Sequence, residues 1–561
     1  DSELPEFILK CGSIRPGNIV ELRDHSRRAS NHPISGDFLL VRSIVENVKS
    51  EEVVLRGFRM RRCTYLRPLF DGKLNDVFML IEVRENDKRP RFVQGLEDVS
   101  PDEVIHKREC VFTNVDYDIL DTCHVNRFVP ARLRSQDEKL KWLFRHGKLI
   151  CRWVHIVELH KNGKSYGGEA RRMYKREVSD FSQQGDLSAS VPPESSIPQG
   201  TSTAAISANS SLSIESRKRI SSIEESDNLA FKRPKSMPSK PRVFTLGDGF
   251  CDSGGVSSGA QQAGFKVMWG LDKDKTAMKA YRKNFPGAQH LEMDAHVFPG
   301  IAKRCFHGCD HLHMSCPCNY WAECHTVNGK NDEANMLTIY TVEAWLGALK
   351  PRAFSLEQAP GLLKQEQHKL YFRNLINGVL SRGYGVRWKI QDQAWLTLPQ
   401  HRRRLIFVGS KTGIPLPPFP APIRGPPGSG LKRYTTIEDA LKIVECQSFA
   451  LRNNRYHQPQ LEKRLDLEPI DPHVNLAKCV TTSGGDNVHH SGQRLYTVIE
   501  LAQLQGFLLD HCFAGSLTQA KTQCGNAWPP RSNKHYFLLW AAHREAFDNG
   551  FIGPEDEVLD L

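Results

Sequence analysis

Three types of side chain, spaced along this chain, could act together on one substrate. Cys318 follows Pro317 at the end of a short apolar segment, which places a thiol in a cleft rather than in a core. The thiolate is the reactive form of cysteine, and a nearby cation or helix N-terminus lowers the pKa of the thiol. Glu357 ends another strand-like segment, and Arg402 and Arg404 lead into a third. A thiol, a carboxyl and two guanidinium groups at one sheet edge could converge on one crevice.

A second set of residues could bind an adenosine-containing cofactor. The Gly-rich turn Phe250–Gly255 follows a strand-like segment, and such a turn lets a ligand approach the backbone closely. Asp272 stands past the next such segment, where a carboxylate can accept two hydrogen bonds from a ribose diol. Asp294 stands past the one after that, where it could accept a hydrogen bond from an adenine amine. Each Asp alone is more simply a solvated loop end, but three such features in order favour a cofactor.

Alternating strands and helices are expected to position these residues. The pattern predicts strands at 243–246 and 266–271, a helix over 275–284, and a strand at 405–409. This βαβ rhythm is typical of a doubly wound α/β fold, in which ligands bind at the carboxyl ends of the strands.

The region from Arg242 to Glu545 resembles the cytosine-specific DNA methyltransferases that form 5-methylcytosine. The motifs that carry the resemblance occur in the family's order: Phe250–Gly255, Asp272, Asp294, Pro317-Cys318, Glu357, Gln400-x-Arg402-x-Arg404, Arg494–Glu500 with Leu504–Phe507, and Gln523–Pro530. The resemblance implies a Rossmann-like fold that uses S-adenosylmethionine and carries a small target recognition domain. It also implies that double-stranded DNA is the substrate and that the target base is flipped out of the helix.

The resemblance also implies a role for each matching residue. Cys318 would attack carbon 6 of cytosine and so activate carbon 5, and Glu357 would hold N3 and the exocyclic amine. Arg404 would bind the base carbonyl, and Arg402 would support the cleft or a phosphate. The implied cofactor residues are Phe250, Gly254, Gly255, Asp272, Asp294, Pro317 and Asn526, with Phe250 stacking near the adenine.

Departures from the family pattern surround these residues. Asp252 stands where Gly is usual and puts an acid beside the cofactor loop. Gln358 stands where the family carries the shorter Asn, so the loop that bears Cys318 is expected to be held differently. Trp528 replaces a small aliphatic residue near the cofactor. Three functions stay open: an active DNA methyltransferase, a chromatin or DNA-binding scaffold that retains the fold, and an RNA cytosine methyltransferase.

Composition divides the chain into regions with different character. The predicted regions are a β-rich domain at 1–176, a Ser-rich linker at 177–241, the catalytic core at 242–410, a target recognition region at 411–493, the rest of the core at 494–545 and an acidic tail at 546–561. The apolar residues of the linker are too sparse to offset the entropy lost on ordering.

The N-terminal region resembles a bromo-adjacent homology domain, a module of chromatin proteins. Residues 36–41 and 57–62 carry that resemblance, which implies histones or chromatin proteins as partners. The alternative is a β-domain that only packs against the rest of the chain. Together with the Glu357-Gln358 variant, this region resembles the fungal branch linked to premeiotic, repeat-induced methylation, and so implies genome defence or repeat silencing.

Charge and motif content indicate the cellular setting. Lys plus Arg number 76 against 64 Asp plus Glu, a net charge of +12 that favours a polyanionic partner. Basic clusters at 217–219 and 232–235 resemble a bipartite import signal and predict a nuclear location. No apolar stretch reaches the ~20 residues that a membrane span needs. Cys and His are dense between 305 and 324, but without a C-x-x-C pair we expect no metal.

Overall fold

The computed structural model of the chain describes residues 1–23, 37–115, 120–126, 129–182, 242–305, 308–322, 332–482 and 487–553. The described residues before and after the gap at 183–241 form one compact unit. Most of the predicted linker, both basic clusters and the end of the acidic tail lie outside the described residues. Among the described helices, none is long and apolar enough to cross a membrane.

The catalytic region is built on a sheet with the strand order β15-β14-β13-β16-β17-β19-β18. All neighbouring strands are parallel except around β19, which is antiparallel to both β17 and β18. The strands are β13 (Thr245–Gly249), β14 (Lys266–Asp272), β15 (Gln289–Glu292), β16 (His311–Met314), β17 (Ala353–Gln358), β18 (Tyr384–Asp392) and β19 (Arg403–Lys411). The α/β class is therefore confirmed, although the strand predicted at 243–246 begins two residues late, at Thr245.

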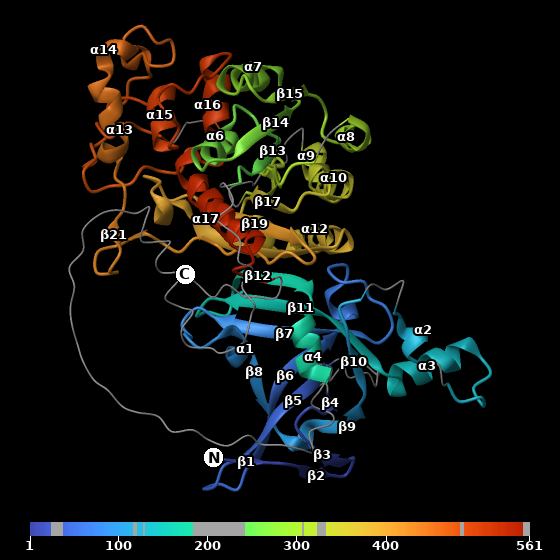
Figure 1. Cartoon of the computed structure of the whole chain (residues 1–561). Helices are drawn as coiled ribbons and strands as arrows, with labels where there is room; N and C mark the ends of the chain where they lie inside the picture. The colour runs from blue at the N-terminus through green and yellow to red at the C-terminus, as the bar shows by residue number, and fades with distance from the viewer. Residues whose placement is uncertain are drawn as a thin grey trace. The chain divides into compact units, whose positions relative to one another are not determined.

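The strands of this sheet are buried on both sides, because helices cover both of its faces. In β19, Leu405 and Phe407 join one apolar core while Ile406 and Val408 join the other, as strand alternation requires. Figure 1 shows α6 and α17 against one face and α10 and α12 against the other. The helices of this layer are α6 (Gly255–Gln262), α7 (Lys275–Asn284), α8 (Phe298–Cys305), α9 (Asp332–Leu337), α10 (Thr341–Leu349), α11 (Gly361–Lys364), α12 (Lys369–Ser381) and α17 (Pro530–Asp548).

The segment between β19 and α17 adds small strands and helices beside the sheet. Its elements are β20 (Arg424–Gly425), β21 (Lys432–Arg433), α13 (Ile437–Cys446), α14 (Ser448–Leu451), α15 (Val498–Leu504) and α16 (Leu517–Asn526). Helix α13 begins at a capping box in which Thr436 accepts from the Asp439 amide and Asp439 accepts in return. Helices α13 and α15 share a small apolar core with the loop around Val480.

The N-terminal region is β-rich, as the alternating apolar pattern predicts. Its strands are β1 (Ser2–Leu4), β2 (Phe7–Leu9), β3 (Gly12–Ile14), β4 (Ile19–Leu22), β5 (Asp37–Glu46), β6 (Val53–Arg62), β7 (Asp76–Arg84), β8 (Leu96–Val99), β9 (Val104–Arg108), β10 (Cys110–Phe112), β11 (Leu149–Leu159) and β12 (Ser165–Arg172). Its helices are α1 (Arg91–Gln94), α2 (Thr122–Val125), α3 (Gln136–His146) and α4 (Lys175–Ser182).

The two regions share one continuous sheet, because β12 pairs antiparallel with β18 at the edge of the catalytic strands. Gly168 lies against the ring of Trp388, and a Cβ at that glycine would stand 2.8 Å from the ring. Buried Glu169 accepts from Arg171 at 2.7 Å and from Arg387 of β18 at 2.5 Å. Burial alone would raise the pKa of the Glu169 carboxyl. The charges of these cations outweigh that effect and lower the pKa to about 2.

We predict that Glu169→Gln destabilises the protein by about 3 kcal/mol, because it leaves buried guanidinium groups without their anion. Since folding lowers the pKa of Glu169, its contribution is present above about pH 4.5 and is lost as the pH falls towards 2. Urea unfolding at pH 7 and pH 3 checks this, and the variant's deficit shrinks at the lower pH.

The matched control is Asp98→Ala, which removes an exposed partner of Arg56. Its expected effect is below about 1 kcal/mol, as for other exposed ion pairs. Equal losses of stability in the two variants would contradict a buried ion pair at the junction of the two regions.

Candidate active site

A cavity of 580 Å³ lies at the carboxyl ends of β13, β14, β15 and β16. Most of the predicted site residues line it, namely Phe250, Gly255, Asp272, Asp294, Pro317, Cys318, Glu357 and Asn526. Its size is within the range of about 300–1,000 Å³ that holds small ligands. Gly254, Arg402 and Arg404 do not line it.

The Gly-rich turn between β13 and α6 forms one wall of this cavity. Gly254 caps α6 with a φ of 97°, a left-handed conformation that Gly adopts at little cost. Phe250 has a φ of 59° and stacks on Trp345, with the ring centroids 5.8 Å apart. At Gly255 an added Cβ would stand 2.8 Å from the Cβ of Ala527. The close approach of α6 to the loop before α17 therefore requires a glycine at this position.

Carboxylates gather where the cofactor residues meet. Asp272 accepts from the backbone amides of Asp252 and Asp274, at 3.0 and 2.9 Å. Asn526 donates to Asp252 Oδ2 at 3.0 Å, whereas Asp252 Oδ1 is buried and has no partner among the described residues. Burial and then the nearby charge of Asp272 raise the pKa of Asp252 to about 7. A buried, unpaired carboxylate oxygen in an acidic cavity suits a cationic ligand.

The loop after β16 presents Cys318 to the cavity beside Pro317. Gln358, at the end of β17, donates from Nε2 to the carbonyl oxygen of Cys316 at 2.9 Å. The longer side chain therefore braces the backbone of the cysteine loop directly. The expectation that this loop is held differently from that of the family stays a prediction.

The Cys318 thiol is protonated at neutral pH, contrary to the expectation that a nearby cation lowers its pKa. Burial, followed by the negative charge of Glu357, raises the pKa of Cys318 to about 11. Arg404 and Arg402 act in the opposite direction but are outweighed. The cations fail to activate the thiol because other groups already engage them.

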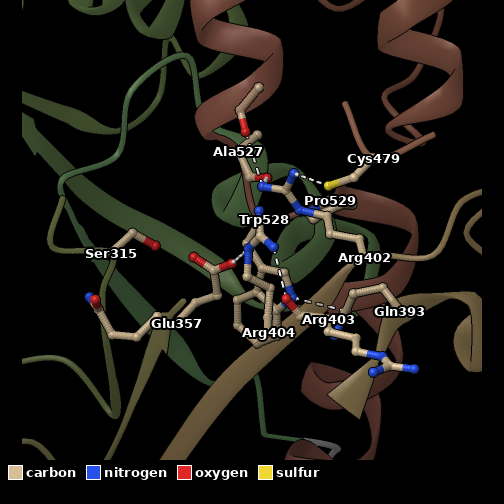
Figure 2. Close-up of polar contacts among 12 residues, drawn as sticks. Ser315, Glu357, Gln393, Arg402, Arg403, Arg404, Cys479, Ala527, Trp528 and Pro529 are labelled. Atoms are coloured by element: carbon tan, nitrogen blue, oxygen red, sulfur yellow. Dashed lines mark hydrogen bonds and ion pairs between the residues drawn. The ribbon is translucent and has the colours of Figure 1, made fainter. Parts of the chain in front are cut away.

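Arg404 forms an ion pair with Glu357, with Nε 2.7 Å from Oε1, although the two groups are not aligned as a hydrogen bond. Figure 2 shows the guanidinium of Arg404 beside the Glu357 carboxylate. Glu357 is 3% exposed, so the pair lies almost wholly in protein. The pair fixes a carboxylate within the same cavity wall as the Cys318 thiol.

Arg402 is buried and joins three segments of the catalytic region. It donates to the carbonyl oxygens of Val480, Gly525 and Ala527 at 2.9–3.1 Å. Figure 2 shows it between Cys479 and the segment that begins at Ala527. Of the two roles expected for Arg402, this position matches support of the cleft rather than contact with a phosphate.

A buried chain of polar side chains reaches the cavity and was not anticipated from the sequence. Ser355 Oγ lies 2.8 Å from His313 Nδ1, and His313 Nε2 lies 2.6 Å from Ser315 Oγ at the cavity wall. Burial lowers the pKa of His313 to about 3, so its ring is neutral. Alternating His and Ser on adjacent buried strands is the signal that could have found this chain. No three metal-ligating side chains cluster among the described residues.

The fold and the cavity define an α/β protein with a thiol and several carboxylates facing one cavity of a size that holds a small ligand. Residues 244–462 match the family model of the C-5 cytosine-specific DNA methylases. The match covers less than half of the chain and indicates a DNA (cytosine-5-)-methyltransferase that uses S-adenosylmethionine as methyl donor. The cofactor and enzyme class inferred from the sequence are thereby confirmed.

Relatives of this region include bacterial enzymes of known class. The Type II methyltransferase M.NgoFVII of Neisseria gonorrhoeae is 27% identical over 333 residues, which are 53% of this chain and 85% of the relative. The Type II methyltransferase M1.HphI of Haemophilus parahaemolyticus is 26% identical over 322 residues, 51% and 84% of the two chains. The Entamoeba histolytica methyltransferase EhMeth has a solved structure with a TM-score of 0.39 at 15% identity, covering 55% of this chain and 99% of its own.

We predict that cofactor affinity rises with pH near neutrality, because ionised Asp252 attracts the cationic sulfonium of S-adenosylmethionine. Calorimetric titration should show about fivefold tighter binding at pH 8 than at pH 6. Asp252→Asn should abolish that dependence, and neutral S-adenosylhomocysteine should show little of it. An equal pH response with both ligands would contradict the role of Asp252.

The same carboxyl predicts how the stability of the ligand-free protein depends on pH. Folding raises the pKa of Asp252 above its unfolded value of about 3.9. Its favourable contribution is therefore complete below about pH 4 and is lost as the pH rises through 7. Thermal midpoints between pH 5 and 8 should fall less steeply in Asp252→Asn than in the unmodified protein.

Removal of the Gln358 brace should slow turnover without removing the cofactor site. Gln358→Leu frees the loop that carries Cys318, and we expect a loss of about 100-fold in kcat, as for other misplaced reactive groups. Gln358→Asn, one methylene too short to reach Cys316, should fall between. Methylation rates together with S-adenosylmethionine affinity check this, and an unchanged rate in a folded Gln358→Leu protein would refute the brace.

Proposed function

We propose that this enzyme methylates carbon 5 of a flipped-out cytosine through a covalent adduct with Cys318. The observation that supports the proposal is the single cavity lined by Cys318, Glu357 and the acidic cofactor residues. Carbon 5 of cytosine is a poor nucleophile, so addition of sulfur to carbon 6 is needed to push electron density onto it. Such an attack requires a base outside the stacked duplex.

The covalent step balances as addition followed by elimination. The Cys318 thiol releases its proton to solvent, and its sulfur bonds to carbon 6 while the π electron pair of the carbon 5–carbon 6 double bond moves to carbon 5. Bound S-adenosylmethionine supplies the methyl group that carbon 5 takes up. The carbon 5 proton then leaves to solvent, the double bond re-forms, and the bond between sulfur and carbon 6 breaks.

Glu357 and Arg404 act as one unit in this proposal. The carboxyl holds N3 and the exocyclic amine of the base as charge moves onto the ring. Arg404, 2.7 Å from the carboxylate, keeps Glu357 in place and presents its remaining donors towards the base carbonyl. The pKa of Cys318 is raised to about 11, so little thiolate is present at neutral pH. In this proposal the thiolate forms when its bond to carbon 6 of the bound base offsets the free energy of deprotonation.

The contact made by Gln358 supports the enzyme proposal over the scaffold alternative. That alternative rests on the departure at Glu357-Gln358-Ala359, because of which the cysteine loop is expected to be held differently. Gln358 contacts the backbone of Cys316 at 2.9 Å, which is compatible with an ordered loop for catalysis. An RNA substrate remains the alternative that the experiment below separates.

We further propose a nuclear role in the silencing of repeated DNA, with the N-terminal region as a contact for histones or chromatin proteins. The support is the resemblance of residues 36–41 and 57–62 to a bromo-adjacent homology domain and the Glu357-Gln358 variant. The basic clusters of the linker support nuclear import. Nucleosome binding by the full chain, with and without the substitution Arg59→Glu in the N-terminal region, tests the chromatin contact.

Covalent trapping tests the proposed mechanism. The protein is mixed with S-adenosylmethionine and duplex DNA that carries 5-fluorocytosine, in which fluorine blocks the elimination step. We expect a denaturation-resistant complex with the unmodified protein and with Cys512→Ala, an exposed cysteine that does not line the cavity. Cys318→Ala should form none. Trapping on RNA but not on DNA would favour the RNA alternative, and no trapping on varied sequences would favour the scaffold.

A further inference from the structure

A second cavity of 700 Å³ lies away from the cofactor site, among residues that the catalytic chemistry does not use. Four of its lining residues are cations, namely Arg424, Lys432, Arg433 and Arg531, against one acid, Asp439. The lining residues come from β20, β21 and the beginning of α13, which follow one another in sequence, and from the beginning of α17, about 100 residues later. The fold therefore gathers positive charge at this point.

Only part of that charge is balanced within the protein. Arg433 pairs with Asp439 at 2.6 Å. No ion pair to Arg424, Lys432 or Arg531 occurs within the described ranges. Burial, and then the positive charge of Arg424, lower the pKa of Arg531, and the charge of Asp439 acts in the opposite direction.

Buried polar atoms at this cavity also lack partners. Thr435 is 6% exposed, and its hydroxyl has no hydrogen-bond partner among the described residues. Arg424 Nε is likewise buried and unpaired. Such atoms are rare in proteins and call for a ligand, an ion or a water. A hydroxyl and guanidinium donors together suit the oxygens of an anion.

Two helix N-termini add to the same field. Thr436 caps α13, and Arg531 is the second residue of the 19-residue helix α17. The first-turn amides of α13 already bond to Asn475, Pro472 and the Thr436 hydroxyl, so it is the helix dipoles that favour a negatively charged group here. The helix ends, the cations and the unpaired Thr435 hydroxyl thus point to one kind of ligand.

The cavity lies at the same edge of the sheet as the reactive groups. Its lining residue Thr397 belongs to the loop that joins Asp392, at the end of β18, to Arg403, at the start of β19. Glu357 ends the neighbouring strand at that edge, and Arg404 follows seven residues after Thr397. The cations around Thr435 and the Glu357 carboxylate therefore lie at one edge of the sheet.

We propose that Arg424, Lys432, Arg531 and Thr435 form a binding site for a backbone phosphate of the substrate DNA, outside the pocket for the flipped base. This inference rests on the proposed action on DNA. The bound phosphate accepts from the Thr435 hydroxyl and the Arg424 guanidinium, and it relieves the repulsion between Arg424 and Arg531. Because a phosphate carries no sequence information, the site positions the duplex rather than selects the target.

Duplex DNA binding by variants of the full chain tests the site. Arg424→Gln and Arg531→Gln should each weaken binding about tenfold at 0.1 M salt, and Thr435→Val somewhat less. The slope of log affinity against log salt should become shallower by about 0.9 for the loss of one phosphate contact. The same weakening should appear with unrelated DNA sequences.

A matched pair of lysines separates the site from the general positive charge. Lys432→Gln removes a charge at the cavity, whereas Lys411→Gln removes an exposed charge at the opposite end of β19. The proposal expects weakening only in Lys432→Gln. Equal effects in both variants, or none in Arg424→Gln and Arg531→Gln, would overturn it.

A second measurement distinguishes DNA from a free anion and guards against misfolding. Inorganic phosphate should raise the thermal midpoint of the unmodified protein and not that of Arg424→Gln. Stabilisation by phosphate without any loss of DNA affinity in the variants would overturn the DNA assignment. Covalent trapping at saturating DNA should persist in Arg424→Gln, so failure of trapping in the unmodified protein counts against the catalytic proposal alone.

Discussion

The reversal of β19 within an otherwise parallel stretch of sheet is the constraint on which the catalytic end depends. Because β19 runs antiparallel to β17, the start of one strand lies beside the end of the other. Arg404 thereby reaches Glu357, although 46 residues separate them along the chain. The same edge receives the cysteine loop after β16, so Cys318 comes to lie near Glu357 and Arg404 at one end of the sheet.

Burial then sets the character of each reactive group. The cations near Cys318 are engaged, Arg404 by Glu357 and Arg402 by backbone carbonyl groups, so desolvation dominates and the pKa of the thiol rises to about 11. Around Asp252, burial and the charge of Asp272 disfavour the ionised carboxylate. A bound cation would stabilise that ionised form. In the protein without ligands, this arrangement keeps the Cys318 thiol protonated at neutral pH.

The N-terminal region is attached to this machinery by main-chain pairing. The strand β12 extends the catalytic sheet past β18, and Glu169 neutralises Arg387 within the joint. Main-chain pairing removes an exposed edge that would otherwise be open to other chains. The N-terminal strands therefore act as a structural continuation of the catalytic sheet, whatever else their outer surface binds.

The sequence alone determined the α/β class, the methyl donor and the residues that gather around the cavity, because strand–helix periodicity and motif order are local properties of the chain. It could not determine the protonation of Cys318, the buried position of Arg402 or the brace from Gln358 to Cys316, since each depends on which groups surround a side chain after packing. The sheet shared by β12 and β18, and the cations gathered around Thr435, were equally beyond prediction. Contacts between distant segments arise only when tertiary structure brings charges, donors and strand edges within a few ångströms, where desolvation and Coulomb terms take effect.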